Sequence, residues 1–267
     1  FEKAFDLCSA DPELANIQIR VVVGPHERGY TSDLESLIRN SETSDIEPVR
    51  SNDTALITFT TGSSGVPKGA DRTHRFLAAQ HRALDRVIPY NESDRDLPVF
   101  PIFSLNNLAG GVTTVLPAID LAAPSDKDAA IIVNQIRLGK VTCCTISPSI
   151  FVNIAEYCHQ RSIIFTGLRR VVTGGAPVSK DNVKNFKSIA PSAEILVLYG
   201  STEVEPIAHI EADEMLRDET EKEGVNVGKI SGDLEYKFIK IWRKNVELGK
   251  MGWKEWPSWL KGGLITT

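Results

Sequence analysis

The sequence lacks the features that would place it across a membrane or on a nucleic acid. None of its apolar runs is long enough to span a bilayer. The first residues, FEKAFD, lack the basic and then apolar regions that mark a secretory signal. A formal net charge of -5 at pH 7 argues against general binding to nucleic acid or to a membrane surface. We therefore expect a cytoplasmic protein with no transmembrane segment and no nucleic-acid partner.

Cysteine is also scarce. The 267 residues include four cysteines, and their spacing matches no metal-ligand pattern: Cys8, Cys143, Cys144 and Cys158. Cys143 and Cys144 are adjacent within an apolar run, which favours reduced core residues. The sequence has no internal repeat and no low-complexity tract. With 42% hydrophobic and 24% charged residues, its composition is that of an ordinary globular protein with ample core.

From residue 129 to residue 198, apolar residues alternate between helical and strand spacing. Ala129, Ile132, Val133 and Ile136 have helical spacing, and residues 141–146 form an apolar strand-like run. The same alternation continues through residues 151–158, 168–173, 183–190 and 194–198. Strands separated by helices predict an α/β fold with mostly parallel sheets flanked by helices.

The chain is expected to contain three parts. Residues 1–50 are interpreted as the end of a first α/β subdomain, and residues 51–223 as the central α/β core. Beyond Gly224, the alternation in residues 234–241 is typical of a half-exposed antiparallel sheet. We therefore expect a smaller antiparallel β subdomain over residues 224–267.

A glycine-rich stretch, TFTTGSSGVPKG at residues 58–69, lies between an apolar strand-like run and a helix-like run. Thr73 is a suitable N-cap for that helix. Backbone N–H groups of such a loop, with its hydroxyls and Lys68, can converge on a phosphate. It is not a Walker A loop, because Pro67 displaces the second glycine and Gly69 follows Lys68. A plain Gly/Ser connection is the alternative interpretation.

Two further motifs follow strands in the same way. Gly174-Gly175-Ala176-Pro177 ends one strand, and Tyr199-Gly200-Ser201-Thr202-Glu203 ends the next. With the stretch from Thr60 onward, three loops are predicted to meet in one crevice at the carboxyl ends of parallel strands. Taken singly, Tyr199 and Glu203 are better interpreted as a buried aromatic ring and a solvated carboxylate, but together with the loop at residues 60–69 they favour a binding site.

The three motifs, in this order, resemble those of the acyl-adenylate-forming superfamily, the AMP-dependent synthetases and ligases. The resemblance implies an AMP-forming acid ligase that uses ATP and Mg²⁺, and it makes residues 51–223 the ATP-binding core. It implies that the loop holds the β- and γ-phosphates through Thr60, Thr61, Gly62, Ser63, Ser64, Gly65 and Lys68. Thr202 would bond the α-phosphate and Glu203 would hold the metal. Tyr199 would stack on adenine beside Gly200 and Ser201, opposite Gly175, Ala176 and Pro177.

A closer resemblance, over about residues 54–210, is to the olefin-biosynthesis subgroup that closes β-hydroxy fatty acids to β-lactones. It rests on YGSTEVEPIAH (199–209), on residues 72–74 and 80–84, and on FPIFSLN (100–106). Many members of the superfamily have a histidine where this chain has Ser104. We expect Phe103, Ser104, Leu105 and Gly174 to contact the acid, with an apolar tunnel along residues 104–111.

The resemblance implies a long-chain, β-hydroxylated acid and lactone closure. The alternatives are thioester formation with coenzyme A, a nucleotide-binding module without chemistry, and a phosphotransferase. It also implies that a ribose-binding aspartate, a hinge and a mobile domain with a catalytic lysine follow Thr267, and that further sequence precedes Phe1. We therefore expect residues 1–267 alone to be inactive.

Overall fold

The computed structural model describes residues 21–22, 31–40, 46–60, 68–121, 125, 127–219, 225–232, 234–239 and 263–266. The chain divides into two compact units, residues 1–49 and residues 50–267. In the first unit, β1 (Val21–Val22) pairs in parallel with β2 (Ser32–Asp33). Helix α3 (Leu34–Asn40) follows, and the Asp33 carboxylate accepts a 2.7 Å hydrogen bond from the Ser36 amide. None of the residues of this helix is buried.

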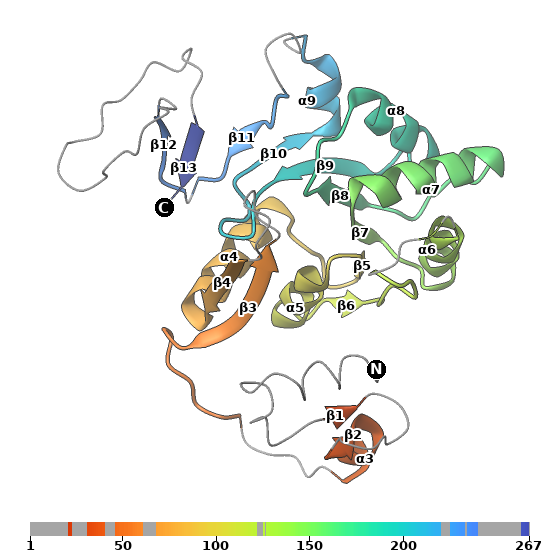
Figure 1. The fold of residues 1–267 in the computed structure, drawn as a ribbon. Coiled ribbons are helices and arrows are strands. Elements are labelled where there is room, and N and C mark those ends of the chain that lie inside the picture. Colours follow the sequence, from red (N-terminus) through yellow and green to blue (C-terminus); the bar gives the residue numbers. More distant parts are fainter. Residues whose placement is uncertain are drawn as a thin grey trace. The chain divides into compact units, whose positions relative to one another are not determined.

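A seven-stranded sheet forms the centre of the second unit (Figure 1). Its order is β11-β10-β9-β8-β7-β5-β6. The parallel strands are β6 (Thr113–Thr114), β5 (Arg95–Pro98), β7 (Cys143–Ile146), β8 (Arg170–Gly174) and β9 (Glu194–Tyr199). At one edge, β10 (Ala208–Glu211) pairs antiparallel with β9, and β11 (Lys229–Ile230) pairs antiparallel with β10. The predicted mostly parallel sheet with helical crossovers is confirmed.

Successive residues of the central strands pack into two different hydrophobic clusters. Val171 and Ile195 belong to the larger cluster, whereas Val172 and Leu196 belong to the smaller one. This follows from the two-residue period of a strand, which turns alternate side chains to opposite faces. Both faces of the sheet are therefore covered.

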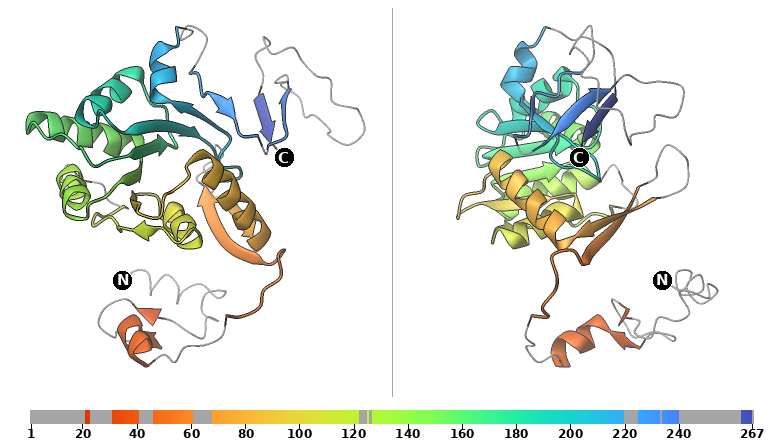
Figure 2. Two further views of the ribbon diagram at one scale, coloured as in Figure 1. Left: turned by 180° about the vertical axis from the view of Figure 1, so that it is seen from behind. Right: turned by 90° about the vertical axis from the view of Figure 1, so that its left-hand side faces the viewer.

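Four helices supply the larger cluster, and two supply the smaller one. The larger cluster contains residues of α6 (Asp128–Leu138), α7 (Pro148–Gln160), α8 (Lys180–Ile189) and α9 (Ala212–Arg217). The smaller one contains residues of α4 (His74–Val87) and α5 (Pro101–Ala109). Figures 1 and 2 show α6, α7 and α8 grouped on one side of the sheet. The result is three layers, with the sheet between two groups of helices.

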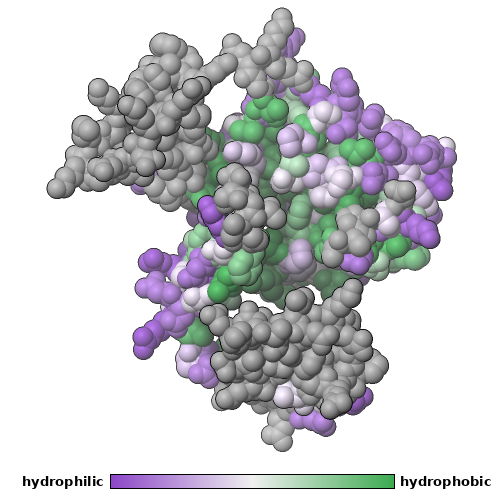
Figure 3. Space-filling view, in the orientation of Figure 1, coloured by the Kyte–Doolittle hydropathy of each residue, from purple (hydrophilic) through white to green (hydrophobic). Residues whose placement is uncertain are grey.

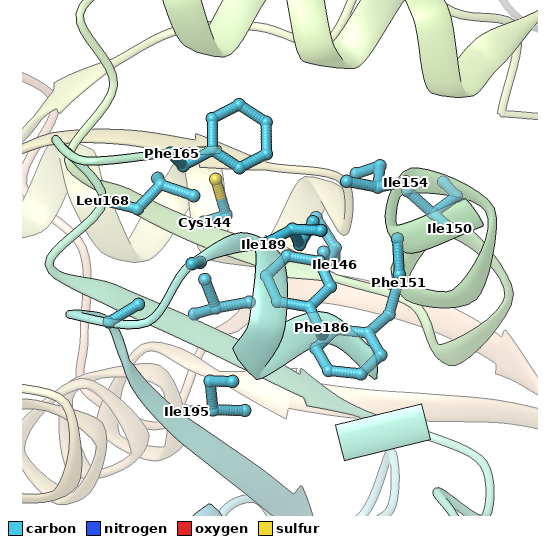
Figure 4. Close-up of a cluster of buried hydrophobic side chains, with 14 of the residues drawn as sticks. Cys144, Ile146, Ile150, Phe151, Ile154, Phe165, Leu168, Phe186, Ile189 and Ile195 are labelled. Atoms are coloured by element: carbon cyan, nitrogen blue, oxygen red, sulfur yellow. The ribbon is translucent and has the colours of Figure 1, made fainter. Parts of the chain in front are cut away.

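The centre of the larger cluster is an aromatic pair. The Phe151 and Phe186 rings, from α7 and α8, stack with centroids 4.1 Å apart, and both side chains are fully buried (Figure 4). Cys144 and Cys158 lie in the same cluster, and Cys143 is buried nearby. These three cysteines are free thiols, as predicted for Cys143 and Cys144, and burial raises the pKa of the Cys143 thiol to about 11. Cys8 lies outside the described residues.

Three helices begin at the hydroxyl residues that sequence pattern favours. The side chains of Thr73, Ser147 and Ser179 each accept a hydrogen bond from the amide three residues later, at the starts of α4, α7 and α8. Pro148 occupies the first turn of α7. Such bonds need only local sequence, because donor and acceptor lie within one turn. The predicted N-cap at Thr73 is confirmed.

The strand before the glycine-rich loop differs from the prediction. Strand β3 (Thr54–Thr60) pairs antiparallel with β4 (Lys68–Thr73) in a separate two-stranded sheet. It is not a buried strand of the parallel sheet, since Ile57 and Phe59 are 55% and 74% exposed. A short apolar run is compatible with either environment. Only two of the three motifs therefore follow neighbouring parallel strands.

Toward the end of the chain, β12 (Tyr236–Ile239) pairs antiparallel with β13 (Gly263–Thr266). Antiparallel pairing was expected for residues 224–267. Strand β11 from the same segment nevertheless joins the main sheet through β10.

Hydrophilic side chains cover the outer end of α7 in Figure 3, whereas hydrophobic ones gather over the sheet. Across the described ranges, we find no helix with the length and apolar character needed to traverse a bilayer.

Candidate functional site

Two pockets adjoin at the carboxyl ends of β8 and β9. The larger, of about 470 Å³, and the smaller, of about 300 Å³, share Gly175, Leu198 and Gly200 as lining residues. The shared residues follow from the pairing of β8 and β9, in which Gly174 lies opposite Leu198. Two neighbouring parallel strands thus contribute residues to both pockets, as expected for an open α/β sheet.

The smaller pocket contains the residues expected around a planar ring. Ala176 and Pro177 line it from the loop after β8, and Tyr199 lines it from the end of β9. Tyr199 is 43% exposed, so its ring is open to a ligand. Met215 and the segment Val225, Asn226 and Val227 complete the wall. Sequence reasoning did not identify that segment, since nothing local links it to β9.

The larger pocket is lined by both apolar and polar residues. The apolar ones include Phe100, Ile102, Phe103, Val172 and Leu198, and the polar ones include Thr58, Arg72, Thr173, Ser201, Thr202 and Glu205. Such a lining suits a ligand with an alkyl part and an oxygen-bearing part. Arg72, Thr173 and Glu205 were not predicted as site residues.

The stretch predicted to contact the acid is only partly at this pocket. Phe103 and Gly174 line it, whereas Ser104 and Leu105 are not among its lining residues. Leu105 and Leu108 are 49% and 73% exposed. The expected apolar tunnel along residues 104–111 is therefore not seen here. Phe103 of α5 is buried in the smaller hydrophobic cluster. Because side chains of a helix point in different directions around its axis, Leu105 and Leu108 of the same helix point away from that cluster.

Local hydrogen bonds shape the segment after β9. The Ser201 amide donates to the Val204 carbonyl at 2.8 Å, and the Val204 amide donates back to the Ser201 carbonyl at 3.1 Å. This tight turn holds Thr202 at the larger pocket and leaves Glu203 exposed. An exposed carboxylate can approach a metal without loss of an existing partner in the protein core.

The glycine-rich loop is described only at its ends. Lys68 opens β4 opposite Thr60, and its side chain is exposed. The predicted phosphate contacts at Thr61, Gly62, Ser63, Ser64 and Gly65 lie outside the described residues, as does the Thr60 side chain.

A buried polar network links the hairpin to the segment after β9. Arg72 of β4 donates from Nη2 to the Thr202 carbonyl oxygen at 2.5 Å. Gln80 of α4 donates from Nε2 to the Glu205 carboxyl at 3.1 Å. Burial raises the pKa of the Glu205 carboxyl, and the positive charge of Arg72 opposes that rise. The hairpin that carries Lys68 is thereby tied to the turn that carries Thr202.

No group of three or more His, Cys, Asp or Glu side chains that could hold a metal is found in the part of the chain that the structure describes. The described residues therefore do not fit a metal held entirely by protein side chains. They do fit Mg²⁺, which binds through one or two carboxylates and takes its other ligands from phosphates and water. Glu203 is an exposed carboxylate that directly follows Thr202, a lining residue of the larger pocket.

Comparison with known proteins agrees with these features. The model of a family described as "AMP-binding enzyme" matches residues 3–252. An olefin beta-lactone synthetase of Stenotrophomonas maltophilia is 34% identical over 71% of this chain and 34% of its own length. The corresponding enzyme of Xanthomonas campestris pv. campestris is 31% identical over 74% of this chain and 36% of its own length. The chain thus spans about a third of the length of these relatives.

The fold has solved counterparts. The O-succinylbenzoate coenzyme A synthetase of Bacillus subtilis, solved with ATP and a magnesium ion, superposes with a TM-score of 0.65. The likeness covers 89% of this chain and 46% of that one, at 16% sequence identity. At this identity the likeness supports the arrangement of strands and helices alone.

Proposed function

Because this chain belongs to the AMP-binding enzyme family, we propose that the full-length protein activates a carboxylic acid with ATP. The products of the first step are an acyl-adenylate and pyrophosphate. One observation carries the proposal. A pocket beside Tyr199 and residues 175–177 adjoins a second pocket with several apolar lining residues, and Thr202 lies at the second pocket. Such a pair can hold a nucleotide base and an acyl chain on either side of a phosphate.

The roles of individual residues follow from the chemistry of the step. A carboxylate oxygen attacks the α-phosphorus in line, and pyrophosphate leaves with the electrons of the broken P–O bond. Most of the barrier is charge and orientation, so donors placed at the phosphate lower it. We assign the α-phosphate contact to Thr202 and the pyrophosphate contact to Lys68 with residues 60–65. Tyr199 would stack on adenine, beside Gly200 and Ser201 and opposite Gly175, Ala176 and Pro177.

Glu203 would hold Mg²⁺, shared with the phosphates. The ion would neutralise phosphate charge, which favours attack by an anionic carboxylate. The sequence motif supports this role, and so does the exposure of Glu203 beside Thr202.

We infer that the acid is a long-chain β-hydroxy fatty acid and that the product is a β-lactone. Phe100, Ile102 and Phe103 are apolar lining residues of the larger pocket, and each buried methylene of an alkyl chain contributes about 0.8 kcal/mol. The β-hydroxyl oxygen would then attack its own activated carbonyl. The bond from the carbonyl carbon to the phosphate oxygen breaks, AMP leaves, and the hydroxyl proton passes to solvent. Proximity favours this intramolecular reaction, which needs no thiol acceptor.

Exchange of labelled pyrophosphate into ATP by the full-length protein tests the first step. We expect exchange that depends on a fatty or β-hydroxy fatty acid and on Mg²⁺. No exchange with any such acid would favour a nucleotide-binding module without chemistry. Release of ADP in place of AMP would identify a phosphotransferase.

Product analysis tests the second step. The full-length protein is given ATP, Mg²⁺ and a long-chain β-hydroxy acid, with and without coenzyme A. A lactone formed without coenzyme A supports the proposal. A thioester made at similar rates from plain and hydroxylated acids reverses it in favour of a fatty acyl-CoA ligase.

A further inference from the structure

Arg72 is a buried arginine at the larger pocket that has no role in the adenylation step as assigned above. It lies on β4, four residues after Lys68, and its side chain is 5% exposed. One amino group, Nη2, bonds the Thr202 carbonyl, and the guanidinium lies 5.6 Å from the centroid of the Phe76 ring. Its remaining donors, Nε and Nη1, are buried and have no hydrogen-bond partner among the described residues.

A second buried arginine shows what a satisfied partner set looks like in this fold. Arg170 is 6% exposed, comparable to Arg72. Its Nε donates to the Glu194 carboxylate and its Nη1 to the Pro89 carbonyl, both at 2.6 Å. The N–H donors of a charged group cost free energy when they are buried without a hydrogen-bond partner, and most buried polar groups therefore have partners. Arg72 therefore has unused capacity at a site where a ligand is expected.

The neighbours of Arg72 define the chemistry of that ligand. The Thr58 and Thr173 hydroxyl oxygens line the same pocket and are also buried without a partner among the described residues. Glu205 lines the pocket too, and its carboxyl accepts a hydrogen bond from Gln80. A hydroxyl group both donates and accepts, so it can accept from Arg72 and donate to a threonine or to Glu205. A carboxylate only accepts, and it would face the oxygen atoms of Glu205.

We propose that Arg72 is a specificity-determining residue that binds a hydroxyl oxygen on the chain of the acid substrate, near its carboxyl end. The inference rests on the function proposed above, and it assigns the substrate class to oxygenated fatty acids through a named residue. The bond from Arg72 to Thr202 places the guanidinium beside the residue assigned to the α-phosphate. The reacting carboxylate is a poor partner, because pairing it with a guanidinium would stabilise the ground state and slow its attack.

The test compares two acids of equal chain length, one with a 3-hydroxyl group and one without, in full-length protein. Acid-dependent pyrophosphate exchange gives kcat/KM for each. The wild type is expected to prefer the hydroxylated acid, because the plain acid leaves the Arg72 donors unpaired. Arg72→Met is expected to lower the preference by roughly tenfold to a hundredfold, the range for a lost hydrogen bond to a charged group.

Two further variants make the result specific. Arg75→Met removes an exposed arginine from the start of α4 and should leave the preference unchanged. Arg72→Lys keeps the charge but loses the guanidinium fork, so it should lose most of the preference. Should Arg72→Met fail to fold in a thermal melt, Arg72→Lys decides the question.

Equal losses of kcat/KM for both acids in the Arg72 variants would overturn the proposal, because they would mean that Arg72 only holds the Thr202 carbonyl. Exchange by the wild type without any preference between the acids would overturn it as well. In both cases the proposed activation of an acid by ATP stands. Absence of exchange with either acid in the wild type is a different result, and it removes the proposed function together with the role of Arg72.

Discussion

Two adjacent glycines at the end of β8, Gly174 and Gly175, differ in what an added side chain would meet: steric crowding at the first and backbone strain at the second. A Cβ added at Gly174 would lie 2.2 Å from the Leu198 carbonyl oxygen and 3.1 Å from its carbonyl carbon. Real Cβ contacts are essentially never shorter than 3.0 Å, and the obstacle here is backbone of the paired strand. At Gly175, φ is +83°, but the nearest atom to an added Cβ is Phe100 Cζ at 3.8 Å.

The two changes to alanine therefore have different expected costs. Gly174→Ala forces β8 and β9 apart, and overpacking of this kind costs about 3 kcal/mol. Gly175→Ala has room but keeps an unfavourable φ, at a cost of about 1 kcal/mol. For a unit of this size, each kcal/mol lowers Tm by about 2–4 °C. We expect Gly174→Ala to lower Tm by about 6–12 °C and Gly175→Ala by about 2–4 °C.

Thermal melts followed by circular dichroism at one scan rate, with the wild type alongside, measure both shifts. A Tm loss at Gly175→Ala equal to or larger than that at Gly174→Ala would refute the reasoning. It would mean that Gly174 is present for ligand contact, as the sequence suggested, rather than for the approach of β9.

Three other predictions use different parts of the second unit. Glu203→Gln and Lys68→Ala should both slow pyrophosphate exchange by the full-length protein, but only the Glu203 variant should recover with excess Mg²⁺; identical responses to metal would contradict the assigned roles. Burial raises the pKa of Asp94, but hydrogen bonds led by the one from Arg169 bring it to about 2, below the usual 3.8. Because the folded pKa is depressed, Asp94 contributes about 2 kcal/mol above pH 4 and loses it as pH falls toward 2. The difference in free energy of unfolding between wild type and Asp94→Asn, from urea titrations, should shrink over that range, and a constant difference would argue against the ion pair. Phe186→Ala should cost about 3–5 kcal/mol in the same assay, and a cost under 1 kcal/mol would show that the aromatic stack is not essential.

Local signals in the sequence determined most of the elements. Thr73 and Ser179 cap helices through bonds that span three residues, so no distant contact is needed to recognise them. The alternation of strand-like and helix-like runs from residue 129 to residue 198 determined the parallel sheet, because parallel strands require crossovers. The motifs after β8 and β9 fall at one edge of the sheet for the same reason.

Other features depend on residues far apart in the chain, and only the tertiary structure decided them. Strand β3 pairs with β4 in a separate hairpin, since a short apolar run does not specify its partner strand. The turn of α5 that buries Phe103 leaves Leu105 and Leu108 exposed. Arg72 belongs to the segment 72–74 that contributes to the closer resemblance, but nothing local marks it as a site residue. It becomes a candidate site residue because β4 lies against the Thr202 turn, 130 positions along the chain, where burial leaves two of its donors without a partner.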